Sequence, residues 1–158
     1  MTLNVGDPAP SFELPDAEGD VVKLTDLQGQ WVVLYFYPRD NTPGCTKEAC
    51  GFRDIFRDYQ DSGVRVLGVS TDDAKSHAKF AKKYDLPFPL LVDAGGAIAS
   101  EYGSYGLKKF MGKEYMGITR STFIIDPDGN LAKIYRKVKP EPHAQEVLSD
   151  MVELSTDG

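Results

Sequence analysis

The chain has few of the side chains that bind metal ions or cross-link small secreted domains. It contains two cysteines and two histidines in 158 residues. Two cysteines do not make the disulfide framework of a small secreted domain, and in a reducing compartment such a pair is more often catalytic or metal-binding. His77 and His143 are not spaced from Cys45 and Cys50 as in a zinc motif, so we expect no metal site and place both histidines at the surface.

The sequence also lacks a membrane-spanning segment and an export signal. No apolar run approaches the roughly 20 residues that cross a bilayer, and residues 1–7 have neither a basic start nor an apolar signal core. Basic residues are outnumbered, 18 against 24 acidic ones, which argues against nucleic acid or an anionic membrane as the main partner. We therefore predict a cytoplasmic protein, with a removed transit peptide as the open alternative.

No internal repeat or low-complexity segment is present, and the length and a hydrophobic content of 41% suit one domain spanning residues 1–158. Apolar runs and turn residues alternate along it. The unbroken apolar run at 31–37 is expected of a strand buried on both faces. We predict strands at 11–14, 21–24, 31–37, 64–70, 90–92, 122–125 and 131–137, and helices at about 43–61, 73–84 and 95–102 and after Pro142. Residues 103–117 show no assignable pattern.

Both cysteines follow the strand 31–37, at the start of a predicted helix. Thr42 is a good N-cap, Pro43 suits the first helical position, and Cys45 then falls in the first turn. Free N–H groups and the macrodipole at this end of a helix favour a thiolate at Cys45. Cys50 lies five residues on, about 140° further round the helix.

The two sulfurs therefore point apart in an intact helix. The Cα atoms of Cys45 and Cys50 would be about 8–9 Å apart, beyond the roughly 7 Å limit for bridging, so a disulfide requires the first turns to unwind. An inert buried pair and a structural disulfide are alternatives, but Pro-Gly-Cys at a helix start is a poor place to bury a thiol.

The segment around the cysteines resembles the signature of the peroxiredoxins, specifically the bacterioferritin comigratory protein or PrxQ type: Pro38-x-x-x-Thr42-x-x-Cys45 followed by Thr46-x-Glu48-Ala49-Cys50. The resemblance continues through residues 86–93 and 115–123 and covers nearly the whole chain. Tyr105 departs from it, because many relatives carry tryptophan there. The resemblance implies a thioredoxin-like α/β fold with a central mixed sheet, flanking helices and an N-terminal β-hairpin, in agreement with the order of the predicted elements.

The resemblance also implies roles for individual residues. Cys45 is expected to be the peroxidatic cysteine and Cys50 the resolving one. Thr42 and Arg120 are expected beside the thiolate, with Glu48 orienting Arg120 by a charge-assisted hydrogen bond. Without the resemblance, Thr42 is equally a helix cap, Arg120 a solvated surface residue, and Glu48 a partner of the helix dipole.

Two neighbouring residues are expected to support this site. Pro38 bends the chain out of its strand, and Gly44 allows other groups to approach the backbone closely. Both residues are also common in loops that have no functional role. Lys108, by contrast, is expected to be a solvated charge.

The implied function is a thiol-dependent peroxidase that reduces hydrogen peroxide and organic hydroperoxides. A Cys45 sulfenic acid would give an intramolecular disulfide with Cys50, which thioredoxin or a similar dithiol would reduce. The resemblance implies no metal or flavin cofactor, and a monomer. Two alternatives stay open: a redox sensor or holdase that uses the same oxidation, and a thioredoxin-like disulfide reductase. The latter normally has two residues between its cysteines, whereas here there are four.

Overall fold

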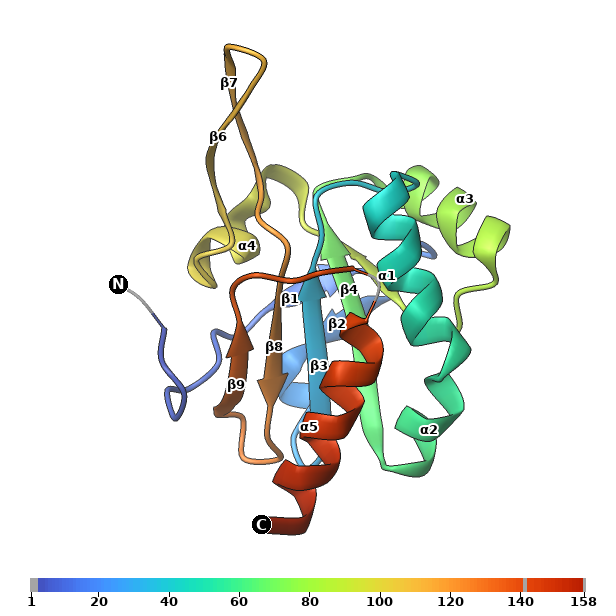
Figure 1. The fold of residues 1–158 in the computed structure, drawn as a ribbon, viewed down its shortest axis with the longest axis vertical. Coiled ribbons are helices and arrows are strands. Elements are labelled where there is room, and N and C mark those ends of the chain that lie inside the picture. The colour runs from blue at the N-terminus through green and yellow to red at the C-terminus, as the bar shows by residue number, and fades with distance from the viewer. Residues whose placement is uncertain (1–2, 141, 158) are drawn as a thin grey trace.

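The computed structural model describes residues 3–140 and 142–157, and its centre is a five-stranded mixed sheet (Figure 1). The strand order is β5-β4-β3-β8-β9. The first three strands are parallel, while β8 runs antiparallel to β3 and β9 antiparallel to β8. These strands are β3 (Trp31–Phe36), β4 (Val64–Ser70), β5 (Leu90–Val92), β8 (Ser121–Ile125) and β9 (Leu131–Tyr135).

Each face of the sheet has its own hydrophobic core, because successive residues of a strand point to opposite faces. Val33 and Tyr35 of β3 pack with four helices, whereas Val32 and Leu34 pack with the N-terminal segment and one short helix. The first face carries α1 (Pro43–Asp54), α2 (Phe56–Asp61), α3 (Ala74–Tyr84) and α5 (His143–Asp157). The second carries β1 (Glu13–Pro15), β2 (Val21–Lys23), the 3-10 helix η1 (Leu24–Leu27) and α4 (Ala97–Glu101), which follows the 3-10 turn η2 (Ala94–Gly96).

The predicted thioredoxin-like arrangement is confirmed, with every predicted strand present and its bounds shifted by at most two residues. The N-terminal hairpin is also confirmed, because β1 and β2 pair antiparallel. The strand 31–37 is buried on both faces as expected from its unbroken apolar run. None of the helices in the described ranges is long and apolar enough to cross a bilayer.

One predicted helix is in fact two. The segment 43–61 breaks at Ile55, whose backbone (φ −117°, ψ 19°) is not helical. The two halves have different partners, since α1 packs on α5 and α2 packs along β4. Tertiary contacts set such a change of direction. The helical periodicity of the segment does not report them, so the break was not predicted.

The unassigned residues 103–117 are mostly a β-hairpin. Strands β6 (Tyr105–Phe110) and β7 (Lys113–Ile118) pair antiparallel and project from the body of the molecule (Figure 1). Their turn, Met111-Gly112, has positive φ at both residues, as in a two-residue hairpin loop. The strands show little alternation in sequence because side chains on both faces meet solvent: the consecutive residues Tyr115 and Met116 point to opposite faces and are 48% and 54% exposed.

Candidate active site

Cys45 lies in the first turn of α1, directly after the loop that leaves β3. Pro43 opens the helix, and Thr42 holds the N-cap position with an extended backbone (φ −91°, ψ 157°). The Cys45 side chain is buried, and its thiol is not in a disulfide. The sulfur is therefore inside the protein at the amino end of a helix, where N–H groups without intrahelical acceptors favour negative charge.

Arg120 approaches Cys45 from the neighbouring strand. It precedes β8, whose first residue, Ser121, pairs with Phe36 at the end of β3. The Arg120 Nη2 donates to Cys45 Sγ at 3.4 Å, and Nη1 donates to Glu48 Oε1 at 2.6 Å. Arg120 thus contacts both the cysteine and the glutamate, in the arrangement expected from the resemblance.

Glu48 is completely buried beside Arg120. Burial raises the pKa of Glu48 to about 7, against the opposing charge and hydrogen bond of Arg120. Burial lowers the pKa of Arg120, but the charges of Glu48 and Cys45 and their hydrogen bonds raise it by more, so Arg120 stays a cation. Because the two side chains meet at 2.6 Å, we take the ion pair as their form at and above neutral pH.

Gly44 makes room for the guanidinium. A Cβ atom added there would lie 2.9 Å from Arg120 Nη2 and 3.5 Å from the ring of Pro140. Any side chain at this position would push Arg120 away from the sulfur. The close approach predicted at Gly44 is therefore present, and the atom that approaches is the one that contacts Cys45.

Thr42 departs in part from its predicted contacts. It occupies the N-cap position, but its side chain makes no capping bond. The hydroxyl donates instead to the carbonyl oxygen of Arg39, at 3.1 Å, while the Thr42 carbonyl accepts from the N–H of Thr46. The hydroxyl therefore forms a hydrogen bond within the loop and does not cap the helix.

Cys50 lies on the same helix in a different environment. It is half-buried, whereas Cys45 belongs to the hydrophobic core. Both thiols are free, and both residues lie inside the continuous helix α1. The predicted separation of the two side chains around the helix is consistent with this difference in burial.

A cleft of about 370 Å³ lies beside the loop after β3, between that loop and the β6–β7 hairpin. Pro38 and Arg39 line one side, and Tyr115 and Met116 of β7 line the other. Lys108 also lines it and is not the solvated charge predicted from sequence, because its Nζ donates to the carbonyl of Ile118. Burial lowers its pKa, as does the charge of Arg120, with Cys45 opposing.

The surface positions predicted for the histidines are wrong, since both rings are fully buried. His77 bonds Asp40, and His143 bonds the hydroxyl of Thr122. Burial of these polar rings is possible because their nitrogens have partners. Asp40 and His77 are 37 residues apart, so their pairing left no local signal in the sequence.

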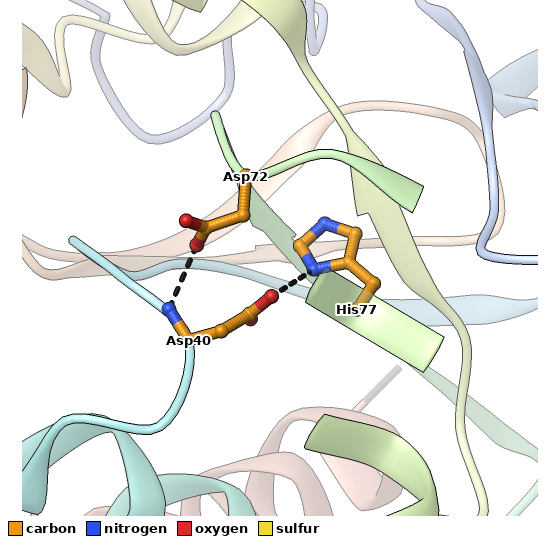
Figure 2. A group of neighbouring side chains, drawn as sticks. All are labelled: Asp40, Asp72 and His77. Atoms are coloured by element: carbon orange, nitrogen blue, oxygen red, sulfur yellow. Dashed lines mark hydrogen bonds and ion pairs between the residues drawn. The ribbon is translucent and has the colours of Figure 1, made fainter. Parts of the chain in front are cut away.

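Asp40, Asp72 and His77 form a group in which one polar side-chain atom of each residue lies within 4.8 Å of the other two (Figure 2). Hydrogen bonds within the group account for this closeness: Asp40 Oδ2 meets His77 Nδ1 at 2.7 Å, and the Asp40 N–H donates to Asp72 at 2.7 Å. The group is therefore a hydrogen-bonded network.

Comparison with known proteins gives a consistent result. A family model described as "AhpC/TSA family" matches residues 5–134. The chain is similar to a putative peroxiredoxin bcp of Coxiella burnetii, with 49% identity over 94% of this chain and 98% of the relative. It is also similar to peroxiredoxin Bcp of Bacillus subtilis, with 48% identity over 98% of this chain and 99% of the relative.

Solved structures agree with the sequence relatives. A mutant of Xylella fastidiosa PrxQ superposes with a TM-score of 0.92 at 33% identity, covering 98% of this chain and 99% of that one. The bacterioferritin comigratory protein of Xanthomonas campestris, described together with its alkyl peroxide reduction activity, gives a TM-score of 0.86 at 36% identity over 91% and 92% of the two chains.

Proposed function

The chain belongs to the AhpC/TSA family, and within it to the Bcp-type peroxiredoxins, and on that premise we propose that Cys45 is the thiol its peroxide substrate oxidises. The reaction class is thiol-dependent peroxide reduction. One observation carries the assignment to Cys45: its sulfur lies 3.4 Å from Arg120 Nη2, and Glu48 holds that guanidinium in place.

In the first step the Cys45 thiolate attacks one oxygen of the peroxide, and the O–O bond breaks. An S–O bond forms, Cys45 becomes a sulfenic acid, and the other oxygen leaves as an alcohol or water after taking up a proton. Negative charge moves from sulfur onto the peroxide oxygens during this step. Arg120 and the N–H groups of Gly44 and Cys45 at the helix start are the donors placed to stabilise it.

We assign Thr42 to the same pocket as a further donor to the peroxide. Its hydroxyl bonds the Arg39 carbonyl, and a change to another χ1 rotamer would redirect it. Pro38 supports the pocket by turning the chain out of β3, where it lines the cleft beside the loop.

In the second step Cys50 attacks the sulfenic sulfur of Cys45. The S–S bond forms and water leaves, so the oxidation passes into a disulfide within one chain. An external dithiol of the thioredoxin kind then reduces this disulfide by thiol exchange. Because both cysteines lie on α1, the cycle needs no second copy of the chain, and we propose that the protein acts as a cytoplasmic monomer.

The test is a peroxide-consumption assay with an excess of a thioredoxin system, using hydrogen peroxide and an alkyl hydroperoxide in parallel. Wild type should consume both. Cys45→Ser should consume neither, because a serine hydroxyl is not ionised at neutral pH and the neighbouring Glu48 carboxylate is bonded to Arg120. Near-wild-type consumption by a folded Cys45→Ser protein would overturn the assignment.

A further inference from the structure

A buried histidine lies next to the loop that leads into α1, but it takes no part in the proposed reaction. His77 is on α3, and its ring has no exposed surface. Its Nδ1 lies 2.7 Å from Oδ2 of Asp40, and its Nε2 lies 2.8 Å from the carbonyl oxygen of Leu91 on β5. Figure 2 shows the Asp40 carboxylate reaching the His77 ring, and the Asp40 backbone nitrogen reaching Asp72.

The partners of the ring determine its protonation. A carbonyl oxygen only accepts hydrogen bonds, so His77 Nε2 must carry a hydrogen to bond Leu91. Asp40 already accepts from the Tyr37 hydroxyl on Oδ1, at 2.6 Å, and from the Ser76 hydroxyl on Oδ2, at 2.8 Å. An ionised Asp40 has no hydrogen to donate, so Nδ1 must also donate across its 2.7 Å contact with Oδ2. These contacts define His77 as an imidazolium.

The charges around the ring agree with this state. Burial lowers the pKa of His77, but the hydrogen bond and charge of Asp40, the Leu91 carbonyl and the charge of Asp72 raise it by more, to a value above the usual 6.5. Burial, with smaller effects of neighbouring groups, raises the pKa of Tyr37 well above 10.0, so its hydroxyl keeps its hydrogen. The charged or titratable groups around the ring and its carboxylate are Asp40, Tyr37, Asp72, Lys79 and Lys83.

The network fixes the backbone of the loop as well as its side chain. The N–H of Asp40 donates to Asp72 Oδ2 at 2.7 Å, and the same oxygen accepts from the Ser70 hydroxyl at the end of β4. Asp40 is therefore tied through both main chain and carboxylate. The next residue, Asn41, has a left-handed backbone with φ of 59°, and α1 begins two residues later. Asp40 is thus the last strongly held point before the helix that presents Cys45.

We propose that the Asp40–His77 ion pair positions the loop before α1, so that Cys45 meets Arg120 in the reactive geometry, and that it sets the upstream limit of the segment that unwinds when Cys45 and Cys50 join. Asp40 and His77 are positioning residues, because neither contacts the sulfur. The effect of the pair on rate rests on the proposed role of Cys45, whereas the charge of His77 and the anchoring of the loop do not.

The proposal has a definite pH dependence. The folded-state pKa of His77 lies above its unfolded value, so the pair is fully present below about 6.5 and is lost as pH rises through the folded value. Deprotonation leaves Nδ1 without a hydrogen to donate to the Asp40 carboxylate, which loosens the loop. The peroxide step should therefore fall on the alkaline side, where ionisation of cysteine alone gives only a rise followed by a plateau.

The first test is nitrogen NMR of the full chain labelled with ¹⁵N in its two histidines, assigned with His77→Gln. At neutral pH both ring nitrogens of His77 should have the shifts of protonated nitrogens. His143 is the internal control: it is equally buried, but burial lowers its pKa, so it should be neutral. A His77 ring with one protonated nitrogen at neutral pH would overturn the proposal, whatever the activity of the enzyme.

The second test measures the second-order rate of sulfenic acid formation against pH. Asp40→Asn and His77→Gln should be slower than wild type by about tenfold at neutral pH, as expected of a misplacement by a fraction of an ångström, and should lack the alkaline fall. His143→Gln should keep that fall. Hydrogen exchange in reduced Asp40→Asn should show lost protection at residues 37–42.

Wild-type rates and an unchanged alkaline fall in folded Asp40→Asn would contradict the positioning role. If His77→Gln does not fold, the near-isosteric Asp40→Asn and the wild-type NMR measurement still decide the question. A failure of the proposed function is distinguishable, because it would appear as activity in Cys45→Ser while leaving the His77 measurement unaffected.

Discussion

Arg120 is the residue on which the proposed chemistry depends most after the cysteine itself. One nitrogen of its guanidinium bonds the sulfur, and a second bonds Glu48, so the planar fork spans both. A lysine has one charged nitrogen and cannot make both contacts in a fixed plane. The glycine at position 44 lets this fork approach the helix start, which makes the arrangement specific to this loop.

Arg120→Ala should lower the second-order rate of the peroxide step by about two orders of magnitude, the size seen when one oxyanion-type donor is lost. Arg120→Lys should fall between the alanine variant and wild type. Stopped-flow measurement of sulfenic acid formation under single-turnover conditions gives this rate directly.

The matched control is Arg136→Ala, which removes a half-buried arginine that bonds the carbonyl of Tyr102, away from the site. It should leave the peroxide step within about twofold, as expected of a residue that touches no reacting group. Equal rates for Arg120→Ala and Arg136→Ala would remove Arg120 from the proposed mechanism.

At the scale of the residue, the sequence predicted the contacts that belong to a short motif. The spacing around Cys45, with the resemblance it carries, gave the contacts of Arg120 and Glu48. The sequence predicted the wrong environment for His77, which was expected at the surface. The ring is buried with a hydrogen-bond partner, Asp40, that lies far along the chain. Pairings between distant segments have no periodicity to reveal them.

At the scale of the element, α1 has two unlike halves. Its later turns are held by packing: Phe52 is fully buried, Gly51 lies against Ala144, and the Arg53 guanidinium donates to the Tyr84 carbonyl at 2.8 Å. In its first turns Cys45 and Ala49 are buried in the core, and Glu48 contacts Arg120 in the same buried site. Burial raises the pKa of Glu48, so its ionised form is destabilised in the folded helix above about pH 7, and unwinding rehydrates it.

Oxidation should therefore melt only the start of α1. A Cys45–Cys50 disulfide needs Cα atoms within about 7 Å, whereas a regular helix holds them about 8–9 Å apart. Hydrogen exchange should show lost protection at residues 43–51 in the oxidised protein, retained protection from Phe52 onward, and recovery on reduction.

Helix α3 is the control for this measurement, because it contains no cysteine and should exchange equally in both redox states. Unchanged protection at residues 43–51 in a protein whose disulfide has been verified by mass spectrometry would refute the local unwinding.

The elements that were predicted well are those with a strong local pattern. The unbroken apolar run of β3 and the alternating strands and helices around it identified the sheet. The β6–β7 hairpin was missed because its exposed strands have no buried face to impose alternation. The break at Ile55 was missed because different tertiary partners, not local residues, separate α1 from α2.

At the scale of the whole molecule, the sheet brings together residues that are distant in sequence. The end of β3 and the start of β8 are paired neighbours, which places Arg120 beside a helix that begins more than seventy residues earlier. We expect the separate cores on the two faces to keep this sheet fixed when the first turns of α1 unwind. Strand order and register depend on such long-range pairing, so sequence patterns indicated a mixed sheet without its order.

In the proposed cycle, Cys45 takes an oxygen from peroxide, and Cys50 displaces that oxygen as water when the disulfide forms. The measurement is rapid mixing with one equivalent of hydrogen peroxide, followed by an acid quench and mass spectrometry of the intact chain. Wild type should lose two hydrogens as the disulfide forms, and Cys50→Ser should react as fast but stop with one oxygen on Cys45. Cys45→Ser should stay unmodified. Loss of the rapid first turnover in Cys50→Ser, with the oxygen found on Cys50 in Cys45→Ser, would contradict the account by reversing the two cysteines.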